Sequence, residues 1–303
     1  MQEIIAQVQK AIRRPKQVFG GIFSWVFSKS PLPDYIYLKI LYWLKTGKKL
    51  DLISPILFNE KVQWLKLYDR NPDYPIFVDK YEVRKYISKT IGEEYLIPLY
   101  GIWDSFEEIH FDMLPDQFVL KCTHDFDSII ICRDKNSLDL KKTAKYLKKR
   151  LAKNHYWKCR EWHYKHVRPR IIAEQLLLDE SGFELKDYKI FCFNGFPRII
   201  QVDIDRFTNH KRNLYTPQWQ FQHINLGYLS DLKKDIPKPL CLDKMLDLAR
   251  KLSAGKIHVR VDFYIIDMRI YFGELTFYHA GGYQRFDPPE WNKIFGDWMV
   301  LPN

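Results

Sequence analysis

Two acidic residues lie inside apolar, strand-like segments near the C-terminal end of the chain: Asp262 in segment 258–265 and Glu274 in segment 270–276. Carboxylates on neighbouring strands can bind Mg²⁺, which prefers one or two carboxylates together with the phosphates of a substrate. A buried salt bridge with Arg260 is the structural alternative, but it would leave one of the two acids without a cation. The pair therefore favours a magnesium site.

The same two segments predict a hairpin with polar side chains on one face. Because side chains alternate along a strand, Arg260 and Asp262 share a face of the first strand. On the returning strand, Phe272, Glu274 and Thr276 are expected to share a face. Arg260 could neutralise a phosphate or a developing oxyanion beside the carboxylates.

Lys121 is a further candidate, because it lies at the end of the apolar segment 117–122. A lysine in such a place is costly to bury unless it meets an anion, and an ATP phosphate would satisfy it as a point charge. A second apolar strand at 128–132 completes a hairpin, whose tip at 123–128 could close over a nucleotide. The tip lacks the glycines of a Walker loop or a Rossmann turn. The alternative for the lysine is a solvated position at a sheet edge.

The apolar pattern predicts an α+β fold, in which antiparallel strands alternate with helices after a helical N-terminal region. The dipeptide Asn194-Gly195 between two strand-like runs is typical of a tight hairpin. Helices are expected at 34–45, 58–65, 79–86, 138–154 and 242–254. Strands are expected at 117–122, 128–132, 170–176, 187–193, 198–203, 258–265 and 270–276.

Composition narrows the class of protein. The 303 residues are 46% hydrophobic and carry a formal net charge of +11, so the chain should fold and attract anions. Nucleic acid, an anionic membrane surface, or an acidic substrate such as ATP or a polyanionic glycan could each explain this charge. Five cysteines without a Cys-x-x-Cys pair argue against a disulfide framework or a zinc site. We therefore expect a cytoplasmic protein.

Residues 1–30 are predicted to form a separate, basic and amphipathic segment. In it Lys10, Arg13, Arg14 and Lys16 precede an apolar run at 18–27. That run is shorter than the roughly 20 residues that a membrane-spanning helix needs. A basic segment followed by aromatic residues can lie in a membrane interface, which would place the protein at the inner face of the membrane. The alternative is a helix that packs on the domain or on a partner.

The order of these features along the chain resembles the ATP-grasp superfamily. A lysine-bearing strand and a hairpin tip come first, a strand with Glu174 follows, and an Arg-x-Asp strand paired with a Glu-x-Thr strand comes last. More specifically, the chain resembles the TupA-like ATP-grasp family, which is associated with the biosynthesis of teichuronopeptide, capsule and other surface polysaccharides. The resemblance covers about residues 58–302. Its most recognisable pieces are at 58–61, 79–84, 118–121, 187–195 and 261–264.

The resemblance implies a set of residues around the phosphates of ATP. Lys80 matches the lysine that opens the nucleotide-binding lobe, and Lys121 matches the lysine that reaches the α and β phosphates. The loop from His124 to Ser128 matches the segment that covers the phosphates. Its lack of glycines departs from the family pattern.

The resemblance also implies how the nucleoside is held. Glu174, Gln175 and Leu176 would lie on the hinge strand, where the backbone reads the edge of adenine. Asp187 would hold the ribose. Lys189 shares a strand face with Asp187 and would meet phosphate or substrate.

The catalytic and metal positions follow from the same resemblance. Arg260 matches the arginine that stabilises the tetrahedral intermediate, and Asp262 and Glu274 match the two Mg²⁺ carboxylates. Thr276 stands where an asparagine is usual, and a hydroxyl would hold a second Mg²⁺ less tightly. The implied catalytic set is Arg260, Lys121 and Lys189.

The chain is predicted to have three parts: the segment 1–30, a helical region at 31–115, and, as the resemblance implies, an ATP-grasp domain at 116–303. The domain divides into a nucleotide lid lobe at 116–185 and a metal and substrate lobe at 186–303. The implied reaction is carboxylate–amine ligation through an acyl phosphate. ATP, Mg²⁺, an amino acid, and a uronic acid of a surface polysaccharide or its precursor would take part.

Two other functions compete with this one. Asp203 and Asp205 form an Asp-x-Asp pair that could bind the metal and diphosphate of a sugar nucleotide, as in a glycosyltransferase of capsule or O-antigen biosynthesis. A membrane-associated binding module without activity is the other. Segment 153–170 mixes basic and aromatic residues, which suits an acidic-glycan groove, a single-stranded nucleic-acid platform or a packed surface. We expect no nucleic-acid partner.

Overall fold

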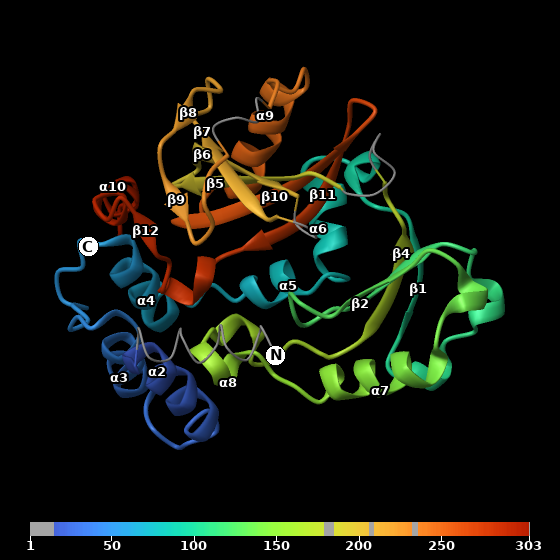
Figure 1. Cartoon of the computed structure of the whole chain (residues 1–303), viewed down its shortest axis with the longest axis horizontal. Helices are drawn as coiled ribbons and strands as arrows, with labels where there is room; N and C mark the ends of the chain where they lie inside the picture. The colour runs from blue at the N-terminus through green and yellow to red at the C-terminus, as the bar shows by residue number, and fades with distance from the viewer. Residues whose placement is uncertain (1–14, 179–184, 206–208, 232–235, 303) are drawn as a thin grey trace.

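The computed structural model describes residues 15–178, 185–205, 209–231 and 236–302. Of the predicted N-terminal segment, Lys10, Arg13 and Arg14 lie outside the described residues. Figure 1 shows a large sheet at the top, a small sheet on the right, and the N-terminal helices at the lower left.

Helices occupy the N-terminal third of the described chain. Helix α3 buries Tyr37, Leu38 and Leu41, and it ends at Gly47, whose φ of 75° is a left-handed conformation that glycine adopts without strain. The expected helix at 79–86 is regular only from Val83, and the Asp79 carboxylate accepts hydrogen bonds from the N–H groups of Tyr81 and Glu82 in the turn before it. The helices are α2 (Pro15–Val26), α3 (Asp34–Thr46), α4 (Phe58–Tyr68), α5 (Tyr74–Val78) and α6 (Val83–Thr90).

The small sheet has four antiparallel strands in the order β1-β4-β2-β3. One face packs on helix α7 (Leu140–Leu151) through buried residues such as Phe118, Leu120, Ile171 and Leu147. The strands are β1 (Leu99–Trp103), β2 (Phe118–Cys122), β3 (Ile129–Cys132) and β4 (Ile171–Gln175). The sequence analysis did not predict β1. This strand comes from the region 31–115, so the sheet is built from both sides of the predicted boundary at residue 115.

The large sheet has six antiparallel strands in the order β11-β10-β5-β6-β7-β8. Helix α9 (Leu242–Ser253) packs across β5, β6 and β10 with an apolar stripe that includes Met245, Leu248, Ala249 and Leu252. The strands are β5 (Asp187–Phe193), β6 (Phe196–Ile204), β7 (Lys211–Tyr215), β8 (Phe221–Gln222), β10 (His258–Ile266) and β11 (Arg269–Thr276).

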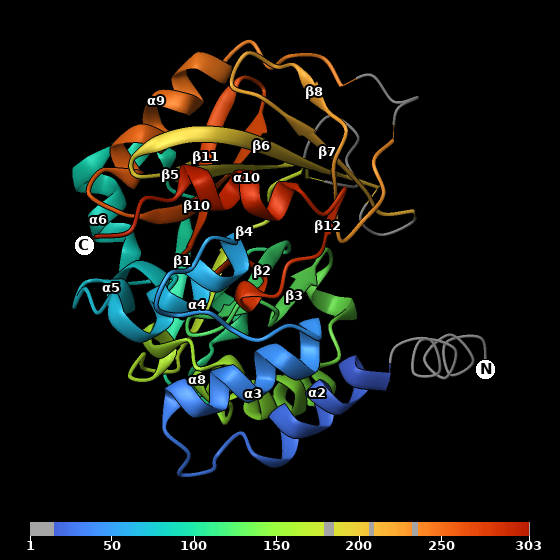
Figure 2. The same ribbon diagram turned by 90° about the vertical axis from the view of Figure 1, so that its left-hand side faces the viewer.

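The remaining elements join these layers. A two-stranded sheet pairs β9 (Asn225–Leu226) with β12 (Phe286–Asp287), and helix α10 (Trp291–Trp298) packs against α4. Helix α8 (Tyr156–Cys159) packs against α2, and the 3-10 turn η6 (His279–Gly282) packs against α4. Figure 2 shows α9 and the large sheet at one end of the molecule and α2 and α3 at the other. The α+β prediction is confirmed.

Candidate active site between the two sheets

Lys121 lies on the open face of the small sheet. Strand pairing places Lys121 opposite Ile129 and Ile172, and Val119 opposite Glu174, so these side chains share the face away from α7. The Lys121 ammonium lies 2.6 Å from the Glu174 carboxylate. The lysine therefore meets an anion on its own sheet and is not a solvated edge residue.

A second cation reinforces this face. Arg84 of α6 lies 3.3 Å from Glu174 and donates a 2.9 Å hydrogen bond to the carbonyl of Ile97. A small cavity beside Glu174 is lined by Lys80, Arg84 and Lys121, and on its other side by β11 at positions 272–273. Lys121 of the small sheet and two cations of the segment 80–84 thus gather at the edge of the large sheet. Arg84 was not among the predicted site residues.

Hydrogen bonds fix the position of the hairpin tip between β2 and β3. Lys80 donates to the carbonyl of Asp125, and Ser128 donates its N–H and hydroxyl to the Asp125 carboxylate. His124 is buried, and its Nε2 lies 3.0 Å from the carbonyl of Lys153 beyond α7. Two predicted nucleotide contacts, His124 and Ser128, are thus engaged in fixing the tip in this structure.

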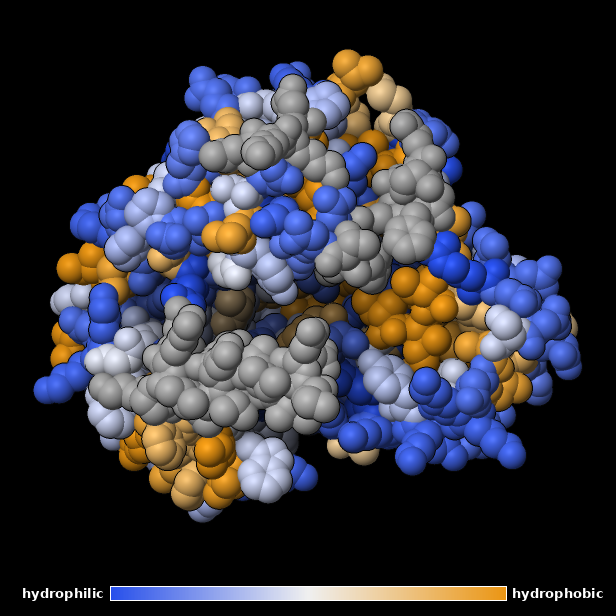
Figure 3. Space-filling model, in the orientation of Figure 1, coloured by the Kyte–Doolittle hydropathy of each residue, from blue (hydrophilic) through white to orange (hydrophobic). Residues whose placement is uncertain are grey.

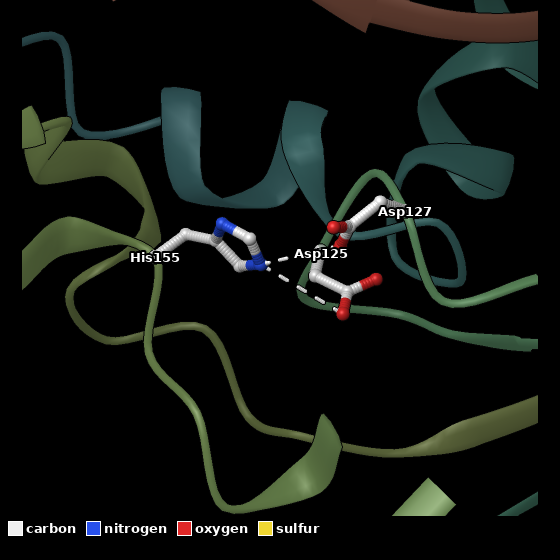
Figure 4. Close-up of side chains that lie close together, drawn as sticks. All are labelled: Asp125, Asp127 and His155. Carbon is white, nitrogen blue, oxygen red and sulfur yellow. Dashed lines mark ion pairs between the residues drawn. The ribbon is translucent and has the colours of Figure 1, made fainter. Parts of the chain in front are cut away.

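Asp125, Asp127 and His155 lie close together at this tip (Figure 4). His155 Nε2 lies 3.8 Å from an oxygen of each aspartate. Arg150 of α7 forms ion pairs with both aspartates, and its Nη2 lies 2.7 Å from Asp125. Because a guanidinium already neutralises the carboxylates, we interpret the cluster as the contact that ties the tip to α7.

The large sheet carries the opposing cluster, which is centred on Arg260. Its guanidinium donates two 2.6 Å hydrogen bonds to the Asp262 carboxylate, one of 2.9 Å to Glu274, and one of 2.9 Å to Nδ1 of His279. The Thr276 hydroxyl donates to Glu274 over 3.0 Å. The four predicted residues of the hairpin therefore form one connected group.

A β-bulge brings Glu274 to this face. Asp262 pairs with Glu274 while Phe263 pairs with Phe272, so Gly273 is an extra residue on β11. A Cβ at Gly273 would lie 3.1 Å from the carbonyl oxygen of Asp262. The expectation that Phe272 and Glu274 share a face was wrong, because simple alternation does not continue through the extra residue.

The neighbouring strands extend the polar face. Lys189 lies 2.8 Å from Asp187, 3.2 Å from Asp203 and 3.9 Å from Asp262. Asp203 also pairs with Arg212 at 2.7 Å. The predicted Asp187 and Lys189 are therefore joined to the Arg260 group through Asp262.

Burial and charge shift the acid–base properties of this group. Burial raises the pKa of Asp262 to about 6, even though Arg260 and Lys189 oppose the change. Burial also acts on Glu274, but Arg260, and after it Lys80 and Lys189, hold the pKa of this carboxyl below its ordinary value. Lys80, which precedes α6, therefore acts electrostatically on a carboxylate of the large sheet.

A cavity of about 440 Å³ lies between the two sheets. Phe126 and Ile129 line it from the small-sheet side, and the aromatic rings of Tyr164 and Tyr278 lie at its wall. The large sheet contributes the polar part of the lining: Asp187, Lys189, Arg260, Asp262, Glu274 and Thr276. We call this space the reaction cavity. Gln175 and Leu176 are not among its described lining residues and lie at the end of β4, where Gln175 N–H bonds the carbonyl of Pro98.

The sequence analysis missed the residues that position the cluster. Burial and the adjacent Arg260 lower the pKa of His279 well below its ordinary range, which keeps Nδ1 available as an acceptor. Lys66 of α4 is fully buried and donates to the carbonyls of Gly281 and Cys159 at 2.7 and 3.0 Å. Gln63 also bonds the η6 turn. In the sequence, only the glycine pair Gly281-Gly282 after His279 indicated that a tight turn lies at this place.

The donor set fits a magnesium ion. Asp262, Glu274 and Thr276 offer carboxylate and hydroxyl oxygens, the hard ligands that Mg²⁺ prefers. Arg260 pairs with both carboxylates, and Lys189 lies 3.9 Å from Asp262. The expectation that a salt bridge with Arg260 would leave one of the two acids without a cation was therefore wrong.

A lysine on a small antiparallel sheet and an arginine–carboxylate cluster on a larger one, with a cavity between the two sheets, are the arrangement of an ATP-grasp protein. The family model described as TupA-like ATPgrasp matches residues 60–300. The chain belongs to this family, as its sequence predicted.

Other comparisons are more distant. A D-alanine–D-alanine ligase from Bacillus anthracis complexed with ATP is 16% identical, with a TM-score of 0.37 over 66% of this chain and 53% of that one. An L-amino acid ligase from Bacillus licheniformis is 12% identical, with a TM-score of 0.44 over 74% of this chain and 49% of that one. This chain thus spans about half the length of both ligases. No curated protein matches the chain.

Proposed function

We propose that the protein is an ATP- and Mg²⁺-dependent carboxylate–amine ligase. The observation that carries this proposal is that the Arg260 group lines the cavity between the two sheets. Lys121 of the small sheet lies beside a smaller cavity that β11 also lines. Membership in an ATP-grasp family supports the use of ATP. We further propose that the product joins an amino acid to a uronic acid of a surface polysaccharide or its precursor.

The cations would bind and orient the nucleotide. Lys121 and Lys80 hold the phosphates, and Glu174 keeps the Lys121 side chain extended along the sheet until the nucleotide arrives. Asp187 and the hinge residues 174–176 hold the nucleoside. His124 and Ser128 fix the tip, so that the backbone of the tip rather than their side chains covers the phosphates.

The acceptor carboxylate would attack the γ-phosphorus of ATP and release ADP. The amine then attacks the carbonyl carbon of the resulting acyl phosphate, loses one proton, and expels inorganic phosphate. Arg260 neutralises the oxyanion at that carbon, because Asp262 and His279 fix its guanidinium in place. Lys189 orients the phosphoryl group. Mg²⁺ bound by Asp262 and Glu274, with Thr276 nearby, would supply charge neutralisation of the phosphates.

The competing glycosyltransferase hypothesis depends on Asp203 and Asp205. Asp203 is buried and paired with Lys189 and Arg212, so it serves as a counter-ion for site cations. Asp205 follows in a left-handed backbone conformation at the end of β6. Neither observation favours a metal–diphosphate site, and the ligase remains the better proposal.

The test is a thermal-shift titration of the wild type and of Lys121→Ala with ATP, UDP-sugars and Mg²⁺. We expect a Mg²⁺-dependent rise in Tm with ATP that Lys121→Ala loses, since a ligand stabilises only the state that binds it. Lys293→Ala, which removes a surface lysine paired with Asp297 on α10, should keep the rise. A rise with a UDP-sugar alone would reject the ligase and direct attention to Asp203.

We also propose that helix α2 contacts an anionic membrane surface. Phe19, Ile22 and Trp25 are 59, 51 and 81% exposed, and the exposed Lys29 follows them. Figure 3 shows hydrophobic residues gathered at the lower-left end of the molecule, over the N-terminal helices. Within the part of the chain that is described, no helix is long and apolar enough to cross a membrane. Aromatic residues beside cations are suited to the interface.

Vesicle sedimentation would test this contact. The wild type should sediment with phosphatidylglycerol vesicles more than with phosphatidylcholine vesicles, and Trp25→Ser should reduce the bound fraction. Leu240→Ser, a change at an 85% exposed residue beside α9 at the other end of the molecule, is the control. Equal sedimentation of the wild type and Trp25→Ser would reject the membrane contact.

A further inference from the structure

A second cavity, of about 610 Å³, adjoins the reaction cavity. Lys45 of α3 and Ala280 of the η6 turn line both spaces. The turn therefore forms the wall between them. The other lining residues come from the end of α3, from α4, and from the segment that follows the turn: Tyr42, Thr46, Lys48, Asn59, Tyr283, Gln284, Arg285, Phe286 and Asn292.

The lining of this second cavity is positively charged. Lys45, Lys48 and Arg285 line it, and no acidic residue does so within the described part of the chain. None of these three side chains forms an ion pair with a described residue, in contrast to Lys121, Lys189 and Arg260 in the site itself. Lys45 lies 4.4 Å from the ring centre of Tyr283. Lys48 and Arg285 therefore have no counter-ion among the described residues, whereas Lys45 also acts on Glu161 in the reaction cavity. Cations gathered in a concave space attract anionic ligands.

Hydrogen bonds and close packing fix the wall of the second cavity. Asn59 of α4 donates to the carbonyl of Gln284 at 2.8 Å and accepts from its N–H at 3.0 Å, and Asn292 accepts from the N–H of Asn59. A Cβ at Gly282 would lie 2.3 Å from Nε2 of Gln63, so this position admits no side chain without movement of α4. The segment that carries Arg285 is therefore held in a defined place beside the turn.

Ring surfaces accompany the cations. Tyr283 is packed between Lys45 and Lys66, and its buried hydroxyl has no hydrogen-bond partner among the described residues. Phe286 is partly exposed in the same lining. Aromatic rings beside cations suit a ligand that presents both an apolar ring face and a negative charge.

We propose that this second cavity binds the part of the acceptor that lies beyond the reacting carboxylate, and that this part is a sugar chain with further negative charges. The inference rests on the proposed function for the reacting end of the acceptor. It specifies in addition that the acceptor is a multiply charged oligosaccharide and not a single sugar acid. Lys48 and Arg285 set this preference, whereas Lys45 serves both cavities.

The experiment is calorimetric titration of the whole chain at low salt with three probes. Trigalacturonate carries three charges, galacturonate carries one, and maltotriose is a neutral chain of the same length as the first. We expect trigalacturonate to bind at least about tenfold more tightly than either of the others, and its affinity to fall as salt is added. Equal affinity for all three probes, or no binding of trigalacturonate, would overturn the proposal.

Substitution separates this cavity from the nucleotide site. The double variant Lys48→Gln, Arg285→Gln should weaken trigalacturonate binding about tenfold and keep the Mg²⁺-dependent rise in Tm with ATP. Lys293→Gln is the control for the loss of a positive charge elsewhere. An unchanged affinity in the double variant would reject the assignment. A wild type that binds trigalacturonate but not ATP would instead reject the ligase and leave the assignment of the positively charged second cavity intact.

Discussion

Arg260 is the residue on which the large-sheet side of the site depends. It bonds Asp262, Glu274 and His279, and all four side chains are buried or partly buried. Two carboxylates share this one guanidinium, so its removal would leave buried negative charge without compensation. Breaking a buried pair in this way typically costs about 3–5 kcal/mol.

This dependence allows a test of the metal site without knowledge of the substrate. Arg260→Gln should lower Tm in the absence of metal, because Asp262 and Glu274 then repel each other. Millimolar Mg²⁺ should restore part of the loss, since the ion would take over the neutralisation of both carboxylates. Differential scanning calorimetry with and without Mg²⁺ measures both effects.

Arg198→Gln is the control, a change at an exposed position of β6. It should change neither the Tm without Mg²⁺ nor the effect of Mg²⁺ on the Tm. If Mg²⁺ leaves the Tm of Arg260→Gln unchanged, the two carboxylates serve only as ion-pair partners of Arg260 and do not form a metal site.

At the scale of elements, the bulge in β11 determines which side chains reach the reaction cavity. The extra residue, Gly273, lets Glu274 stand beside Asp262 while Phe272 turns to the other face. The hairpin itself was predicted from its apolar runs. Its bulge was not predicted, because simple alternation was assumed throughout the strand, although a glycine inside a strand-like run, here Gly273, often marks a bulge.

Gly273→Ala should therefore destabilise the protein. A Cβ there would meet the Asp262 carbonyl at 3.1 Å and the Tyr264 ring at 3.2 Å, and such overpacking costs about 1–3 kcal/mol. Urea unfolding would measure the free-energy change, and the ATP-dependent rise in Tm would report the displacement of Glu274.

The matched substitution is Gly21→Ala in α2, where a Cβ would have nothing within 4 Å. Because alanine favours the helix over glycine by about 1 kcal/mol, this variant should be neutral or more stable. If both substitutions changed the free energy of unfolding in the same direction, the result would contradict the proposed role of the bulge.

The whole molecule should lose stability in mild acid. His258 is buried beside Phe58 and Phe193, and its Nδ1 donates to the carbonyl of Cys192 at 2.9 Å. Burial lowers the pKa of His258 from 6.5 to about 4. The unfolded state therefore binds a proton that the folded state refuses between these two pH values, and stability falls as the pH drops through this window, by about 3 kcal/mol in all.

Urea unfolding at pH 7 and at pH 5 would measure this effect. We expect His258→Gln to lose less stability than the wild type between the two values, because its side chain does not titrate. His223→Gln, at an exposed histidine, should behave as the wild type does. A wild-type loss that persists in full in His258→Gln would exclude this histidine as its source.

The sequence by itself determined the type and order of most elements, and with them the ATP-grasp family. Apolar periodicity is a local property, so α3, α4, α9 and the strands of both hairpins could be predicted from it. The residues of the Arg260 group could be predicted for the same reason, since Arg260 and Asp262 lie two residues apart on one strand face.

Only the tertiary structure decided what the two sheets bring together. Strand β1 joins the small sheet through pairing with β4, about 70 residues away in the sequence. His279 meets Arg260, Lys66 supports the η6 turn, and Lys45 joins two cavities through contacts between distant segments. No short-range pattern records such contacts, because they depend on packing and on the burial of charge, and these exist only once the chain has folded.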